Sequence, residues 1–127
     1  MTPSASGRNI LILHTDSHLA TTLTAILRQN GHAVKLQAEP PLGARRIRAL
    51  KPDLVITSDS YTASTGEPLA AWLRRVVKVP IIAVCNAGDV LAGVRMLEMG
   101  ADDCLTSACG SREALARVNR LLRSKGS

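Results

Sequence analysis

The sequence has few aromatic residues, no closely spaced cysteine pair and no long apolar run, and each absence narrows what the chain can be. It contains one Trp, one Tyr and no Phe, so it is a poor fit to a protein that stacks single-stranded bases on aromatic rings. Its three cysteines (Cys85, Cys104 and Cys109) form no C-x-x-C motif, which argues against a disulfide framework or a zinc site. The longest apolar run, residues 79–85, is too short to cross a bilayer.

Length and composition predict one globular domain. The chain has 127 residues, of which 46% are hydrophobic and 20% charged, enough for a core that needs no disulfide or metal. The first seven residues are polar and lack the apolar stretch of a signal peptide, so we expect a cytoplasmic protein without a membrane partner. We expect a flexible N-terminus over residues 1–8, one domain over 9–123, and a tail or linker start over 124–127. The net charge of +6 allows an anionic partner but does not bear on the fold.

Short aliphatic runs alternate with helical stripes along the whole chain. Strands are predicted at residues 10–13, 33–36, 53–57, 81–84 and 104–106. The five apolar stripes are Leu19/Leu23/Ile26/Leu27, Leu42/Ile47/Leu50, Leu69/Leu73/Val76, Val90/Val94/Leu97 and Leu115/Val118/Leu122. Ser17 and Ser111 are candidate helix starts, whereas Asn30-Gly31 and Gly100 are candidate stops. Such alternation predicts an α/β domain with a parallel sheet covered on both faces.

Several phrases of the sequence resemble a known family. Residues 27–31 (LRQNG), 51–55 (KPDLV) and 99–106 (MGADDCLT) resemble the CheY-like receiver domain of bacterial response regulators. Residues 111–118 (SREALARV) are most similar to the subfamily of winged-helix transcription factors, the OmpR/PhoB type. This resemblance implies a flavodoxin-like, doubly wound (βα)5 sheet of strand order 2-1-3-4-5. It also implies a site at the carboxyl ends of the strands.

The resemblance implies a phosphorylation site at five positions, and this sequence departs from the family at all of them. Typical receivers have two acids after the first strand that hold magnesium, and an Asp at the end of the third strand that accepts the phosphoryl group. A Ser or Thr ends the fourth strand, and a Lys follows the fifth. The residues at these positions are His14, Thr15, Ser58, Cys85 and Ser107.

These departures predict that the ordinary phosphorylation switch is lost. Magnesium prefers carboxylate oxygens, so we expect weak or absent magnesium binding and no other cofactor. Ser107 supplies no cation for a transferring phosphoryl group, and Ser58 could form only a phosphate ester. We therefore expect a non-enzymatic pseudo-receiver that serves bacterial signal transduction or transcription control as a dimerisation or protein-docking module.

Other functions of the same region stay open. Asp16 and Asp59 flank the altered positions, so a phosphoreceiver that uses Asp59 is one alternative, although residues 58 and 59 of a regular strand point to opposite faces. A small-molecule sensor, or a soft-metal site of His14, Cys85 and Cys109, is another. The simpler interpretation is an acidic pocket refilled by small neutral residues.

The cysteines themselves have two interpretations. A redox pair between Cys85 and either Cys104 or Cys109 is conceivable because the fourth and fifth strands are neighbours. Buried cysteines that act as small hydrophobic residues are commoner. A hydrolytic enzyme is disfavoured because the sequence has neither a G-x-S-x-G motif nor a P-loop.

The resemblance also implies a two-fold dimer through the fourth helix, fifth strand and fifth helix. Three residues match the types that the family uses on this face: Asp103, Glu113 and Arg117. Two further candidates beside them are Asp102 and Arg95. Gly93 stands where a basic residue is expected. In the alternative interpretation Asp102 and Asp103 are turn residues, and Glu113 and Arg117 form an intrahelical i, i+4 pair.

Two predicted helices are basic. The residues concerned are Arg45, Arg46, Arg48 and Lys51 in the second helix region and Arg74, Arg75 and Lys78 in the third. We expect most of them to solvate helix faces, although an acidic partner would also suit them. No segment resembles a recognition helix, so direct DNA contact is not expected. His18 and His32 are predicted to lie on the surface.

Overall fold

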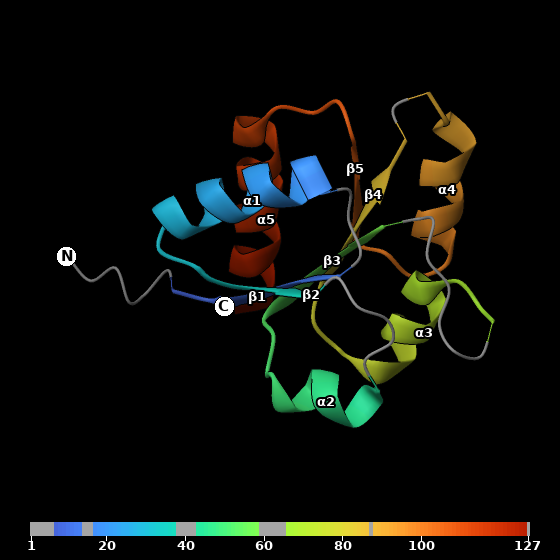
Figure 1. Ribbon diagram of the computed structural model, residues 1–127. Coiled ribbons are helices and arrows are strands. Elements are labelled where there is room, and N and C mark those ends of the chain that lie inside the picture. Colours follow the sequence, from blue (N-terminus) through green and yellow to red (C-terminus); the bar gives the residue numbers. More distant parts are fainter. Residues whose placement is uncertain (1–6, 14–16, 38–42, 59–65, 87, 127) are drawn as a thin grey trace.

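The computed structural model describes residues 7–13, 17–37, 43–58, 66–86 and 88–126, in which strands and helices alternate (Figure 1). The elements are β1 (Asn9–Leu13), α1 (Ser17–Gln29), β2 (Ala33–Gln37), α2 (Ala44–Ala49), β3 (Leu54–Ser58), α3 (Leu69–Val76), β4 (Ile81–Cys85), α4 (Val90–Glu98), β5 (Asp103–Thr106) and α5 (Ser111–Gly126). Each predicted strand is present to within about a residue at either end. The last helix continues to Gly126, past the domain end expected at residue 123.

The five strands form one parallel sheet in the order β2-β1-β3-β4-β5. This is the predicted α/β, flavodoxin-like (βα)5 architecture. The central strands β1, β3 and β4 are buried along most of their length, which explains why they are aliphatic runs without polar alternation. At the edge, β2 is largely exposed.

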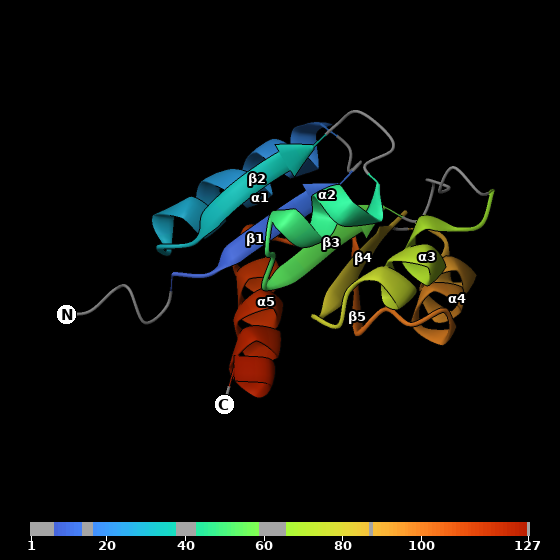
Figure 2. The same ribbon diagram turned by 90° about the horizontal axis from the view of Figure 1, so that it is seen from below.

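Helices cover both faces of the sheet in two separate apolar layers. Figures 1 and 2 show α1 and α5 together on one face, whereas α2, α3 and α4 lie on the other. The α1/α5 layer includes Leu23, Leu27 and Val118, and the opposite layer includes Leu73 and Met96. Successive strand residues therefore contribute to different layers, as the period of two requires.

The predicted helix stops have the expected backbone geometry. Gly31, which follows α1, has a φ of 93°, and Gly100, which follows α4, has a φ of 116°. Both lie in the left-handed region, where a residue without a Cβ meets little steric penalty. At the start of α4, the Asp89 carboxylate accepts a hydrogen bond from the Ala92 backbone N–H and caps the helix.

Two sequence-based interpretations are corrected by the structure. The apolar stripe Val90/Val94/Leu97 does not pack on the sheet; α4 instead buries Ala92 and Met96. His32 is buried at 5% exposure rather than on the surface, while His18 is exposed as expected. The His32 ring bonds the Arg8 backbone N–H and the Asn119 side chain, so it joins the start of β2 to α5.

No helix in the part of the chain that the structure describes is long and apolar enough to span a membrane.

Candidate functional site

Three of the five altered positions lie at the carboxyl end of the sheet, within the described residues. Ser58 pairs with Val84, and Cys85 pairs with Thr106, so β3, β4 and β5 end side by side. The Ser107 backbone N–H donates a 2.9 Å hydrogen bond to the Cys85 carbonyl. Ser58 is partly buried, Cys85 is 2% exposed and Ser107 is exposed. The predicted site residues His14, Thr15, Asp16 and Asp59 lie outside the described residues.

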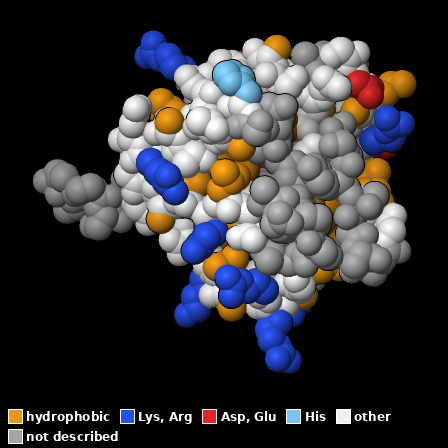
Figure 3. All heavy atoms as spheres, in the orientation of Figure 1, with side chains coloured by type: hydrophobic (Ala, Val, Ile, Leu, Met, Phe, Trp, Pro, Cys, Tyr) orange, Lys and Arg blue, Asp and Glu red, His pale blue; other side chains and the backbone are white. Residues whose placement is uncertain are grey.

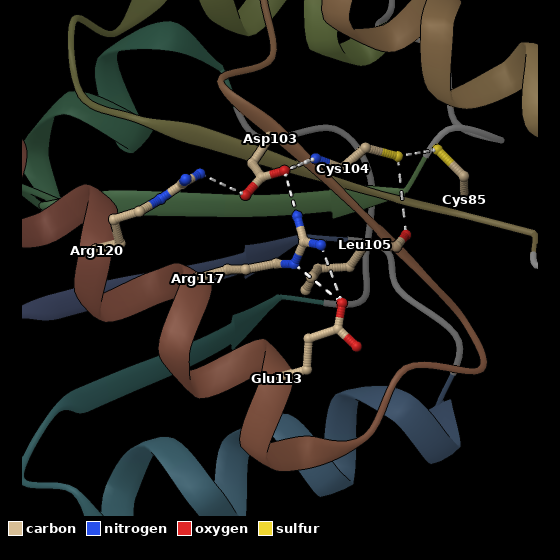
Figure 4. A network of polar contacts seen from close by, with 7 residues as sticks. All are labelled: Cys85, Asp103, Cys104, Leu105, Glu113, Arg117 and Arg120. Atoms are coloured by element: carbon tan, nitrogen blue, oxygen red, sulfur yellow. Dashed lines mark hydrogen bonds and ion pairs between the residues drawn. The ribbon is translucent and has the colours of Figure 1, made fainter.

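Cys85 makes a contact with Cys104 that the spacing of the sequence does not indicate directly. The two sulfur atoms are 2.8 Å apart, with one thiol donating to the other (Figure 4). The register pairs Cys104 with Ala83 rather than with Cys85, so the two cysteines are diagonal neighbours on the same face of the sheet. Cys109 packs against the α1/α5 layer, on the other face from Cys85. The two cysteines of the predicted soft-metal set (His14, Cys85 and Cys109) therefore lie on opposite faces of the sheet.

Asp103 forms a cluster of charged residues with α5, which we call the Asp103 cluster: Asp103, Glu113, Arg117 and Arg120. The Asp103 carboxylate accepts hydrogen bonds from Arg117 Nη1 at 2.8 Å and from Arg120 Nη2 at 3.1 Å (Figure 4). Arg117 also donates to Glu113, one turn earlier on the helix. Asp103, followed by the hydrogen bonds and charge of Glu113, raises the pKa of Arg117 against the opposing effect of burial.

Three of the predicted dimer-face residues, Asp103, Glu113 and Arg117, therefore have partners within this chain. Glu113 and Arg117 form the intrahelical pair of the alternative interpretation, but Asp103 is 9% exposed and is part of a strand rather than a turn. The resemblance does not single out Arg120, the fourth member of the cluster. Its i+3 spacing from Arg117 is the sequence signal that places both on one helix face.

Asp102 has a different role from Asp103, at the beginning of β5. Its carboxylate accepts hydrogen bonds from the Ile81 backbone N–H at 2.8 Å and from Arg74 Nη1 at 3.0 Å. Arg74 also donates to the carbonyls of Val77 and Val79. Asp102 thus fastens β5 to β4 and α3 at the end of the sheet opposite to Cys85.

Much of the exposed side of α4 is apolar, although the stripe Val90/Val94/Leu97 predicts that these three residues pack on the sheet. We call Val90, Leu91, Val94 and Leu97 the α4 patch; their side chains are 78%, 69%, 46% and 48% exposed. Arg95 is exposed on the same helix. Gly93 faces the sheet instead, since a Cβ built there would lie 3.4 Å from Cys104 Sγ. The sequence signal was ambiguous because α4 has apolar residues around most of its circumference.

The basic helices have local partners for several of their charges. Arg48 donates to the Val76 carbonyl, and Arg75 is paired with Glu67 at 2.6 Å. On the face of the molecule in Figure 3, several Lys and Arg side chains lie close together toward the lower edge, and others are scattered. The two pairings agree with a structural role for Arg48 and Arg75.

The described residues show a shallow pocket away from the altered positions. It has a volume of about 440 Å³ and is lined by residues of β1, β2 and the segment after α2, among them Asn9, Ala33 and Pro52. These residues lie toward the beginning of the strands. No group of three or more His, Cys, Asp or Glu side chains in the described part of the chain is arranged to hold a metal.

Comparisons with known proteins agree with this architecture. No protein-family model matches the chain. It is 31% identical over 116 residues to the DNA-binding response regulator MtrA of Mycolicibacterium paratuberculosis, a match that covers 91% of this chain and 52% of MtrA. A two-component response regulator from Clostridium difficile superposes with a TM-score of 0.79 at 24% identity, covering 94% of this chain and 99% of the other. The chain is a response-regulator receiver domain.

A second solved structure supports the same assignment. The receiver domain of the response regulator TorR, of the TMAO respiratory system, superposes with a TM-score of 0.73 at 27% identity. The match covers 92% of this chain and 98% of that receiver domain. The chain spans about half the length of the curated relatives it matches.

Proposed function

We propose that this receiver domain works without the standard phosphorylation chemistry, as a homodimerising or protein-docking module of bacterial signal transduction or transcription control. Its place of action would be the cytoplasm, and its role that of a binding module rather than an enzyme. The observation that carries the proposal is the exposed α4 patch at the edge of the sheet formed by β5. The described side chains at the altered strand-end positions, Ser58, Cys85 and Ser107, are neutral.

The donor chemistry of the strand ends supports the loss of phosphorylation. Among the described positions, Ser58 offers a hydroxyl where the family has a carboxylate, and Cys85 offers a thiol in place of a hydroxyl. Ser107 brings no positive charge to neutralise a phosphoryl group. The sequence places only His14 and Thr15 where magnesium would need carboxylates, so this donor set does not fit a magnesium ion.

Intact-protein mass after incubation with acetyl phosphate and magnesium tests this part of the proposal. We expect no phosphoryl adduct on folded protein, with Asp59→Asn run in parallel as the matched variant. An adduct that is present on the wild type and absent from the Asp59→Asn protein would establish the alternative, a phosphoreceiver that uses Asp59.

The α4 patch supports dimerisation through the α4, β5 and α5 face. Four large apolar side chains on one short helix are costly to leave in water, at about 25 cal/mol for each Å² that remains uncovered. The Asp103 cluster joins the edge strand β5 to α5, on the opposite face of the sheet from α4, so the patch and the cluster flank the same edge of the sheet. A polar rim around an apolar centre is the common anatomy of protein interfaces.

Size-exclusion chromatography with light scattering tests the dimer. We expect the wild type to have about twice the monomer mass of 13.5 kDa, and Val94→Asp to be monomeric because a carboxylate would be buried in the interface. Leu36→Asp is the matched control, since Leu36 is 45% exposed, close to the 46% of Val94, but lies on β2 at the far edge of the sheet. A wild type that stays monomeric at all concentrations contradicts the dimer, as does dissociation by both variants.

A further inference from the structure

Cys85 and Cys104 form a thiol pair with features of a chemical site. Their sulfur atoms are 2.8 Å apart, and they lie on the two neighbouring strands β4 and β5. Cys85 is 2% exposed, within the apolar layer under α3 and α4, and Cys104 is half-buried at the margin of that layer. The pair thus has one shielded thiol and one that solvent can reach.

The helix above the pair leaves room at the outer thiol. Gly93 of α4 faces Cys104, and a Cβ at that position would already contact its sulfur at 3.4 Å. A longer side chain on α4 would cover the thiol. The combination of Gly93 and the half-buried Cys104 therefore favours a small oxidant such as a peroxide over a bulky one.

The third cysteine is excluded from this pair by the sheet itself. Cys109 packs in the α1/α5 layer, whereas Cys85 lies in the opposite layer. Burial raises the pKa of the Cys109 thiol, and the negative charge of Glu113 raises it further against the effect of Arg117. Less of Cys109 is therefore present as the reactive thiolate at neutral pH.

We propose that Cys85 and Cys104 are a redox site that hydrogen peroxide oxidises to an intramolecular disulfide. The Cys104 thiolate attacks the peroxide, so that an S–O bond forms, the O–O bond breaks, and the leaving oxygen takes up a proton as water. The Cys85 sulfur then attacks the Cys104 sulfenic acid, the S–S bond forms, and the hydroxide leaves as a second water with the remaining proton. Two thiols supply the two electrons that reduce one peroxide to two waters.

Closing the bond requires a small movement of β5. A disulfide is about 2.05 Å long, shorter than the present sulfur separation, and the two residues are diagonal rather than directly opposed. β5 has only four residues and lies at the edge of the sheet, so it can shift without breaking pairing on its other side. A thiol reductant would reverse the reaction, as expected of a sensing disulfide in a reducing compartment.

Thiol counting on the full chain tests the proposal. Reduced wild-type protein, treated with hydrogen peroxide and then denatured with N-ethylmaleimide, should take up one label instead of three. Its mass before labelling should fall by about 2 Da, the loss of two hydrogens. Dithiothreitol should restore all three labels.

Trypsin separates the partners and identifies the bond. Cleavage after Lys78, Arg95 and Arg112 places Cys85 in peptide 79–95 and both other cysteines in peptide 96–112. We expect the two peptides to be linked in the wild type and equally in Cys109→Ser, but not in Cys104→Ser. Circular dichroism confirms that each variant is folded.

Several outcomes would overturn the proposal. The first concerns the peroxide concentration at which Cys104 of the Cys85→Ser variant forms a sulfenic acid. If wild-type protein treated at that concentration still takes up three labels, the disulfide does not form. Another is a peptide link that disappears in Cys109→Ser and persists in Cys104→Ser. A link that forms only after the protein is unfolded in urea would show that the folded geometry does not promote it.

Discussion

Asp103 Oδ1 and Arg117 Nη1 are 2.8 Å apart, and this ion pair joins an edge strand to the final helix. The Asp103 side chain is only 12% exposed, and its other oxygen is held by Arg120. Removing the charge of a carboxylate in such a place leaves two guanidinium groups without their shared partner.

Asp103→Asn should therefore lower the free energy of unfolding by about 1–3 kcal/mol. Glu113→Gln is the matched control, because its pair with Arg117 is exposed and contributes about 0.3–0.5 kcal/mol. Urea denaturation followed by circular dichroism measures both. Equal losses for the two variants would contradict a special role of Asp103.

The orientation of α4 can be tested with two neighbouring residues of similar size. Met96 is 4% exposed and Leu97 is 48% exposed. Met96→Ala should cost about 2–5 kcal/mol because it leaves a cavity in the layer over β4 and β5. Leu97→Ala, measured on monomeric protein, should change stability by less than about 0.5 kcal/mol. If Leu97→Ala lowered the free energy of unfolding more than Met96→Ala, the Val90/Val94/Leu97 stripe would be the buried side of α4 instead.

Gly100 is required by both its backbone and its neighbour. Its φ is 116°, and a Cβ there would lie 2.7 Å from Arg74 Cγ. Gly100→Ala should therefore destabilise the domain by at least about 1 kcal/mol and loosen Arg74 from Asp102. Gly110→Ala is the control, since a Cβ at that position has no neighbour within 4 Å. Thermal unfolding of both variants makes the comparison.

Cys109 should react slowly with alkylating agents at neutral pH. Its thiol pKa is raised first by burial and then by Glu113, so the thiolate fraction increases only at higher pH than for an ordinary cysteine. Glu113→Gln removes one cause and should move the pH profile of iodoacetamide labelling toward lower pH. Cys104→Ala is used as background, so that the peptide 96–112 carries one thiol. An unchanged profile in Glu113→Gln would contradict the assigned cause.

The sequence predicts the architecture well because local patterns determine it. The aliphatic runs of β1, β3 and β4 are buried on both sides, and Gly31 and Gly100 end helices where left-handed backbone is needed. The buried side of α4 is not predicted correctly, because apolar residues surround most of this helix and their spacing does not indicate which side packs on the sheet.

The candidate site was only partly accessible to the same reasoning. Successive side chains of a strand point to opposite faces of the sheet, so the prediction of a strand at β5 already places Asp103 and Cys104 on opposite faces. The contact between Cys85 and Cys104 depends on a diagonal offset between β4 and β5, and no property of the two segments alone specifies that offset. His32 is a related case, since the Asn119 side chain that its ring contacts lies 87 residues away in the sequence.

The two successive residues Asp103 and Cys104 connect the thiol pair to α5 through a single peptide bond. The Cys104 backbone N–H donates to the Asp103 carboxylate, which the arginines of α5 also hold. If closing the disulfide changes the affinity of two domains for each other by some factor, thermodynamic linkage requires the reverse effect to be equal. Association would then shift the oxidation equilibrium of each thiol pair by that same factor, so that protein concentration would tune sensitivity to peroxide.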